Sequence, residues 1–94
     1  MNKTDLVERL VIYPGCENLT KKAAGEVVTA VFDLISNALA ERDEVRLVGF
    51  GTFETRERKE RSGRNPKTGD TMTIPASVVP AFKPGAVLKE RVAA

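Results

Sequence analysis

The first forty residues place apolar side chains at the 3.6-residue period of an α-helix. One apolar stripe begins at Leu6. It follows Asn2, and asparagine is a residue type that caps helix N-termini. Pro14 and Gly15 end this segment, because both residue types interrupt helices. A second stripe begins after Thr20, another capping residue, and continues to residue 40. The pattern predicts two helices joined by a short connection.

The second predicted helix has a wide apolar face. Its central stripe is formed by Val28, Val31, Phe32, Ile35 and Leu39, and the flanking apolar positions are Val27, Leu34 and Ala38. One short neighbouring helix cannot cover so much apolar surface. The pattern favours burial against another subunit, and a central core helix in a monomer is the alternative.

After residue 44 the apolar period changes to two, which is typical of β-strands. Gly49 and Gly51 lie between strand signals and predict a tight turn or a close backbone approach. A final short helix is predicted over 86–92, with Pro84 suited to its first turn. The chain therefore combines helices with strands in an α+β pattern.

The pattern of residues 54–75 predicts a polar β-hairpin. Residues 54–61 contain no large apolar side chain, so this strand cannot bury itself. Residues 56–67 contain six basic and two acidic side chains, although the whole chain has a net charge of only +2. An isolated two-stranded hairpin is marginally stable in water. We therefore expect the hairpin to project from the body and to stay mobile until it binds a partner.

The residue types give little support to an enzyme. There is no histidine, so the commonest general base and metal ligand is missing. Cys16 is the single cysteine, and one cysteine makes neither a zinc site nor an internal disulfide. Residues 63–69 look like a phosphate-binding P-loop, but Pro66 stands where that motif needs glycine. We expect no catalytic residue, no cofactor and no metal.

The location of the protein follows from the same sequence. No run of about 18 apolar residues is present, so we expect no membrane span. The first ten residues lack the apolar core of a secretory signal. The lone cysteine fits a reducing compartment. The sequence therefore predicts a cytoplasmic protein.

Nucleic-acid binding accounts better for the basic hairpin. Six side chains can follow a phosphate backbone and release its counterions, namely Arg56, Arg58, Lys59, Arg61, Arg64 and Lys67. A thin ribbon fits a groove, and arginine suits the narrow, negative minor groove. The rigid, apolar ring of Pro66 can act as a wedge between base pairs. Asn-Pro is also common in simple turns, so both roles of Pro66 stay open from the residues alone.

Three motifs, in this order, resemble one known family. They are Val-Gly-Phe-Gly-Thr-Phe over 48–53, Gly-Arg-Asn-Pro-Lys-Thr-Gly over 63–69 and Val-Pro-Ala-Phe-Lys-Pro-Gly over 79–85. With MNKTDLV at the start, the whole chain resembles the bacterial histone-like protein HU and its relative integration host factor. HU and integration host factor are known minor-groove binders that kink the duplex with apolar wedges inserted between base pairs. That behaviour is thus implied by the resemblance and is not worked out from the residues.

The resemblance implies one α+β domain over residues 1–94 that forms an intertwined dimer. Its parts are a helical dimerisation body over 1–40, saddle strands in 41–53 and 76–82, a β-arm over 54–75 and a C-terminal helix over 83–94. The implied DNA-binding residues are Lys3, Arg56, Arg58, Lys59, Arg61, Arg64, Asn65, Pro66, Lys67, Lys83 and Lys89, with Pro66 intercalating. The implied partners are double-stranded DNA, preferably bent, nicked or gapped, and a second copy of the chain or a paralogue.

Val48, directly before Gly-Phe-Gly, favours HU over integration host factor. We therefore expect DNA bending on the nucleoid with little sequence preference. The alternatives are a sequence-preferring subunit like integration host factor, a hairpin that docks on another protein, and RNA binding. The hairpin has no aromatic residue for stacking single-stranded bases, which argues against single-strand binding. The chain departs from the family in a longer connection over 11–19 and in the acidic Glu54, Glu57 and Glu60 of the arm.

Overall fold

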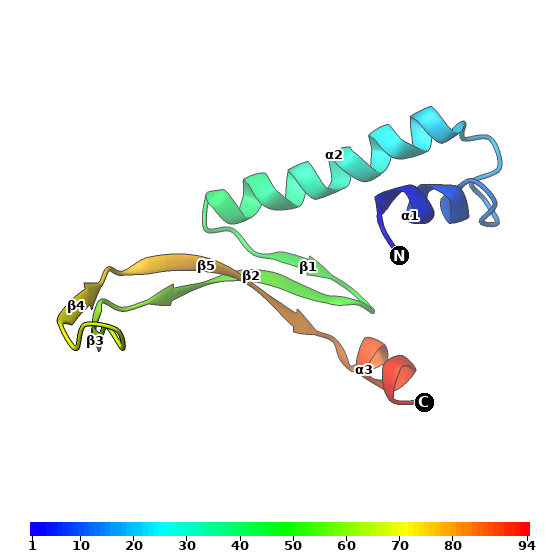
Figure 1. Cartoon of the computed structure of the whole chain (residues 1–94). Helices are drawn as coiled ribbons and strands as arrows, with labels where there is room; N and C mark the ends of the chain where they lie inside the picture. The colour runs from blue at the N-terminus through cyan, green and yellow to red at the C-terminus, as the bar shows by residue number, and fades with distance from the viewer. The chain divides into compact units, whose positions relative to one another are not determined.

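The computed structural model describes all 94 residues and divides them into two compact units, Met1–Asn37 and Ala38–Ala94 (Figure 1). The elements in chain order are α1 (Lys3–Leu10), α2 (Lys21–Ala40), β1 (Val45–Leu47), β2 (Gly51–Arg58), β3 (Arg61–Arg64), β4 (Thr71–Ile74), β5 (Ser77–Pro84) and α3 (Ala86–Ala93). All strand pairs are antiparallel. The predicted α+β class is confirmed.

Both helices of the first unit begin at side-chain caps. Asn2 Oδ1 accepts the Asp5 N–H at 2.9 Å, and the Asp5 carboxylate accepts the Asn2 N–H at 3.0 Å. Thr20 Oγ1 accepts the Ala23 N–H at 3.1 Å. These bonds satisfy N–H groups that a helix start leaves unpaired. The two helices therefore start where the capping residues predicted.

An ordered loop of consecutive turns joins α1 to α2. The Cys16 N–H donates to the Tyr13 carbonyl at 2.9 Å, and the Leu19 N–H donates to the Cys16 carbonyl at 3.1 Å. The Gly15 N–H donates to the Glu17 carboxylate at 2.9 Å. Hydrogen bonds from the backbone N–H groups of Glu17 itself and of Gly15 lower the pKa of the Glu17 carboxyl. The long connection is thus held by hydrogen bonds among its own residues.

The helical unit buries few of its apolar side chains. Ala24 and Val28 are buried, whereas Phe32 is 53% exposed and Leu34 is 68% exposed. Such large contiguous apolar surface is rare on soluble monomers and marks an interaction site. The structure of one chain therefore leaves the wide apolar face of α2 largely uncovered.

The same apolar face makes α2 long and apolar enough to cross a membrane. The helix begins with Lys21 and Lys22 and also contains Glu26 and Asp33. Charged side chains are costly in hydrocarbon. Core helices of soluble proteins meet the same length and composition criteria. We therefore describe α2 as an amphipathic helix whose apolar face is largely exposed in one chain.

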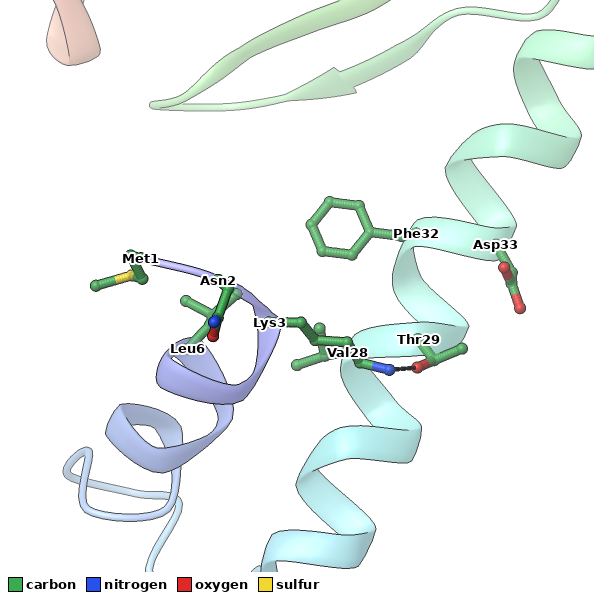
Figure 2. A pocket seen from close by; sticks show the side chains of 8 residues that line it. All are labelled: Met1, Asn2, Lys3, Leu6, Val28, Thr29, Phe32 and Asp33. Carbon is green, nitrogen blue, oxygen red and sulfur yellow. Dashed lines mark hydrogen bonds between the residues drawn. The ribbon is translucent and has the colours of Figure 1, made fainter.

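An apolar cavity of about 480 Å³ lies between α1 and α2 (Figure 2). Leu6 of α1 and Val28 and Phe32 of α2 line it. At its edge the Lys3 ammonium donates a hydrogen bond to the Thr29 hydroxyl (Figure 2). The hydrophobic effect favours filling a cavity lined this way with another apolar surface.

The three-stranded sheet, in the order β1-β2-β5, has one apolar face. The register pairs Val45 with Phe53 and Phe53 with Phe82, and directly paired residues share a face. The ring centroids of Phe53 and Phe82 lie 4.8 Å apart, and those of Phe50 and Phe82 lie 5.3 Å apart. These tilted aromatic contacts define one side of the sheet. On the other side the β2 side chains are polar, and Ala81 and Val79 of β5 lie among them.

The Gly-Phe-Gly motif provides both the turn and the close approach that the sequence predicted. Gly49 has a φ of 82°, in the left-handed region that favours glycine. Gly51 pairs with Pro84 in the sheet. A Cβ atom at Gly51 would lie 2.6 Å from the Lys83 carbonyl oxygen and 2.7 Å from Phe82 Cζ. No side chain fits at this position without displacing backbone.

We expect Gly51→Ala to lower the free energy of unfolding by about 1–3 kcal/mol, because the added methyl overpacks the β2–β5 ladder. Gly63→Ala in β3 is the matched control, since its Cβ atom would meet Ile74 Cδ1 at an ordinary 3.4 Å. Urea unfolding of both variants measures the difference. Equal stabilities for the two variants would contradict the close-approach account of Gly51.

Pro84 does not lie in the first turn of the C-terminal helix, and that prediction was wrong. Pro84 ends β5, where it pairs with Gly51, and Gly85 is the N-cap of α3. The Gly85 N–H donates to the Phe50 carbonyl at 2.8 Å. This bond holds the chain extended through Gly85, so the helix starts only at Ala86.

The helix α2 ends in a Schellman motif with an arginine at its left-handed position. The Asp43 N–H donates to the Ala38 carbonyl at 2.9 Å, and the Arg42 N–H donates to the Leu39 carbonyl at 3.0 Å. Arg42 has a φ of 64° and is the only residue other than glycine with a positive φ. This conformation costs a residue with a Cβ atom roughly 1–2 kcal/mol. Glycine is the usual residue at this position, so helix termination alone does not explain the arginine.

Candidate nucleic-acid interface

The basic hairpin consists of two separate ladders. β2 and β5 stay paired in the three-stranded sheet as far as Arg58 and Ser77, and β3 and β4 form their own two-stranded sheet. Pro75 lies in the interruption, and proline has no N–H with which to continue a ladder. The arm expected over 54–75 thus shares its first residues with the sheet. We call Arg61–Ile74, the separate part, the distal hairpin.

The tip of the distal hairpin is organised by Asn65. The Asn65 N–H donates to the Asp70 carbonyl at 2.8 Å, and the Asn65 carbonyl accepts the Gly69 N–H at 2.7 Å. Asn65 Oδ1 accepts the Lys67 N–H at 2.9 Å, so Asn65 caps a short turn in which Pro66 comes first. Proline suits that position because its missing N–H needs no partner there. The exposed Pro66 has a structural reason for its place that leaves its ring available.

The basic side chains of the arm are exposed and mostly without carboxylate partners. Arg56 pairs with Glu54 at 3.2 Å, and both side chains are partly solvated. Such surface pairs contribute little to stability. The arm cations outside any ion pair are Arg58, Lys59, Arg61, Arg64 and Lys67. Like charges gathered on one ribbon create a positive field that attracts an anionic ligand.

The sheet register brings cations from distant parts of the sequence onto one face. Thr52 pairs with Lys83, and residues at alternate positions along β2 share the face of Thr52, which includes Arg56 and Arg58. Arg46 of β1 joins them because it also pairs with Thr52. This polar face lies opposite the phenylalanine cluster. The alternation does not continue into the distal hairpin, because unpaired residues separate β2 from β3.

The other two predicted cations lie on helices. Lys89 is exposed on α3, in the same unit as the sheet and the arm. Lys3 lies on α1 in the helical unit, where its ammonium donates to Thr29. The structure therefore groups Lys83 with the arm cations on one polar face, while Lys3 belongs to the other unit.

Two exposed arginines were absent from the predicted site. Arg46 alternates with the apolar Val45 and Leu47, and this strand pattern was a sufficient signal for a polar-face position. Arg42 had no comparable signal, because its position depends on the left-handed end of α2. Both belong to the same unit as the arm.

Comparison with known proteins identifies the family of this fold. The family model for bacterial DNA-binding proteins matches residues 1–93. Over 92 residues the chain is 55% identical to DNA-binding protein HU of Geobacillus stearothermophilus, an alignment that covers 98% of this chain and 99% of that protein. The chain belongs to the HU family. The resemblance found in the sequence motifs is confirmed.

Other members of the HU family agree in sequence and in structure. DNA-binding protein HU of Staphylococcus aureus is 54% identical over 92 residues, which cover 98% of this chain and 99% of that protein. An HU–DNA cocrystal structure from Anabaena shares 49% identity, with a TM-score of 0.89 and coverage of 99% and 98% of the two chains. HU from Thermotoga maritima shares 32% identity, with a TM-score of 0.66 and 98% coverage of both chains. The HU-like arrangement of helices, antiparallel strands and hairpin arm is confirmed.

Proposed function

We propose that this HU-family protein is an architectural, histone-like DNA-binding protein. It binds double-stranded DNA in the minor groove with its arms, bends and stabilises the duplex with little sequence specificity, and organises the bacterial nucleoid. The observation that carries the proposal is the distal hairpin, which exposes unpaired arginines and a proline tip. A relative 49% identical over nearly the whole chain has been crystallised with DNA.

Each part of the interface has a distinct task in this proposal. The arm cations Arg56, Arg58, Lys59, Arg61, Arg64 and Lys67 contact phosphates and the floor of the minor groove, while Lys3, Lys83 and Lys89 contact flanking phosphates. Asn65 holds the tip turn and lies at the groove with Pro66. The Pro66 ring enters between two base pairs and keeps a kink open, in the manner described for HU itself.

The functional unit we propose is a homodimer. The exposed apolar face of α2 and the cavity between α1 and α2 support it, since a second copy supplies the missing apolar surface. A heterodimer with a paralogue uses the same surface and is the second candidate. The protein then acts in the cytoplasm, on the nucleoid, as a structural component and not as an enzyme.

The alternatives have weaker support. A sequence-preferring subunit like integration host factor and a hairpin that docks on another protein both use the same arm. The relatives reported above are named DNA-binding protein HU, which favours the architectural function over either alternative. Preference for bent, nicked or gapped DNA follows physically, because predeformed DNA reduces the deformation energy that the protein must supply.

We expect salt-sensitive binding to a short duplex labelled with donor and acceptor dyes at its ends. For 6–10 phosphate contacts, the affinity falls roughly 10³–10⁵-fold between about 50 and 200 mM salt. Energy transfer between the dyes should rise on binding, because bending draws the ends together. The affinity should be higher on the same duplex with one nick.

Three results would overturn parts of this proposal. Salt-sensitive binding with no change in energy transfer would retain DNA as the ligand and reduce Pro66 to a turn residue. Absence of binding to any duplex would reject the architectural function and favour a protein partner for the arm. Strong preference for one sequence among matched duplexes would favour the relative of integration host factor.

A further inference from the structure

A second cationic cluster lies at the root of the arm. A cavity of about 410 Å³ is lined by Arg42, Arg58 and Lys59, together with Glu57 and Ser77. Three cations face one carboxylate there, and none of the three makes an ion pair. Without an anion these cations repel one another, so the arrangement favours an anionic ligand.

Arg42 is the residue of this cluster that stands where the fold favours glycine, although its side chain also caps a carbonyl at the end of α2. It occupies the left-handed position of the Schellman motif, where glycine avoids strain. Its Nη1 donates to the Ala40 carbonyl at 3.0 Å, which anchors the guanidinium beside the helix end. A guanidinium has five N–H donors, so further donors stay available for a ligand. A residue kept in a strained conformation indicates a function for its side chain.

The position of the cavity connects it to the polar face of the sheet. Arg58 pairs directly with Ser77 at the end of the β2–β5 ladder, and both line the cavity. Arg58 also shares the face of Arg56 and Lys83. A duplex backbone that follows this face therefore reaches the cavity where the sheet ends and the arm begins.

We infer that this cavity binds a phosphate group of the DNA backbone, with Arg42 as an additional DNA-binding residue. Guanidinium and ammonium groups with a nearby hydroxyl match the charge and the acceptor oxygens of a phosphodiester. The inference rests on the proposed function and deepens it. Each chain gains a phosphate contact at the root of the arm that does not depend on the tip.

The variant Arg42→Gly separates this role from a structural one. Glycine relieves the left-handed strain, so the urea midpoint of unfolding should be unchanged or higher. The slope of log affinity against log salt should decrease in magnitude by about 1 per protomer, because one phosphate contact is lost. Arg9→Ala, which removes a cation on α1 that does not line this cavity, is the control and should leave the slope unchanged.

The outcomes are distinguishable. A salt slope for Arg42→Gly equal to that of the unchanged protein overturns the inference and leaves the proposed function intact. Inorganic phosphate at constant ionic strength, added without DNA, tests the second source of the same chemistry. If phosphate raises the melting temperature of the unchanged protein but not of Arg42→Gly, while the two proteins have equal salt slopes on DNA, the cavity holds a free anion and the backbone assignment is wrong. Absence of DNA binding by the unchanged protein overturns the proposed function and this inference together.

Discussion

Replacing Phe32 by glutamate is expected to eliminate the folded dimer. The Phe32 side chain is 53% exposed in one chain and lines the apolar cavity between α1 and α2. In the proposed dimer this ring is buried, and loss of a buried aromatic ring costs roughly 3–5 kcal/mol in each protomer. An unpaired carboxylate in an apolar interface adds a further desolvation cost. Sedimentation equilibrium at micromolar concentration should show a dimer for the unchanged protein and none for the variant.

The control for this experiment is Ile12→Glu. Ile12 is 78% exposed in the turn after α1 and does not line the cavity, so the same charge is added outside the apolar face of α2. This variant should remain a dimer, and its helical circular dichroism should match that of the unchanged protein. A monomeric unchanged protein would restore the alternative in which α2 is the core helix of a monomer. A dimer of equal strength in Phe32→Glu would show that the dimer contact does not involve this face of α2.

The local parts of the fold could be predicted because their causes lie within a few residues. The capping residues Asn2 and Thr20 mark the helix starts, and both bonds are present. Gly49 and Gly51 predict a turn and a close approach between backbone segments, and the structure contains both. In each case one side chain, or its absence, decides the local conformation.

The division of the arm could not be predicted in the same way. Residues 54–61 contain no large apolar side chain, so no periodicity shows where one ladder ends and the next begins. The ladder is interrupted by Pro75 on the opposite strand of the hairpin, because proline cannot donate a ladder hydrogen bond. Pro84 illustrates the same difficulty, because its pairing with Gly51 extends β5 to the point where a helical turn was expected.

The candidate site likewise contains residues that the local sequence predicts and residues that only contacts between distant segments bring together. The arm cations and the proline tip all lie within residues 56–67, so local composition alone selects them. Lys83 joins the face of Arg56 only through the β2–β5 register, a contact between distant segments. Arg42 lay beyond prediction because its place depends on a left-handed residue where glycine is usual. The left-handed end of α2 places this side chain beside Arg58 and Lys59 in the cavity, and that helix end has no local sequence signature.

Pro66→Ala is expected to reduce bending of an intact duplex by roughly half or more, because unstacking a base step costs a few kcal/mol and the wedge holds the step open. The turn itself should survive. Asn65 still caps it through Lys67, and the new N–H at residue 66 faces water at an exposed position. The variant should therefore keep its phosphate contacts and its salt slope. Energy transfer between the ends of the labelled duplex measures the bend, and titration at several salt concentrations gives the slope.

Lys67→Ala is the matched control because it changes the neighbouring residue in the same exposed turn. It removes a charge and leaves the proline, so its salt slope should decrease in magnitude by about 1 per protomer while the bend is retained. Pro66→Ala should thus reduce only the bend, and Lys67→Ala should reduce only the salt slope. On a nicked duplex the loss of bending in Pro66→Ala should be smaller, because a nick lowers the deformation energy. If Pro66→Ala bends intact DNA as fully as the unchanged protein, Pro66 is a turn residue, and the kink must come from the charges along the arm.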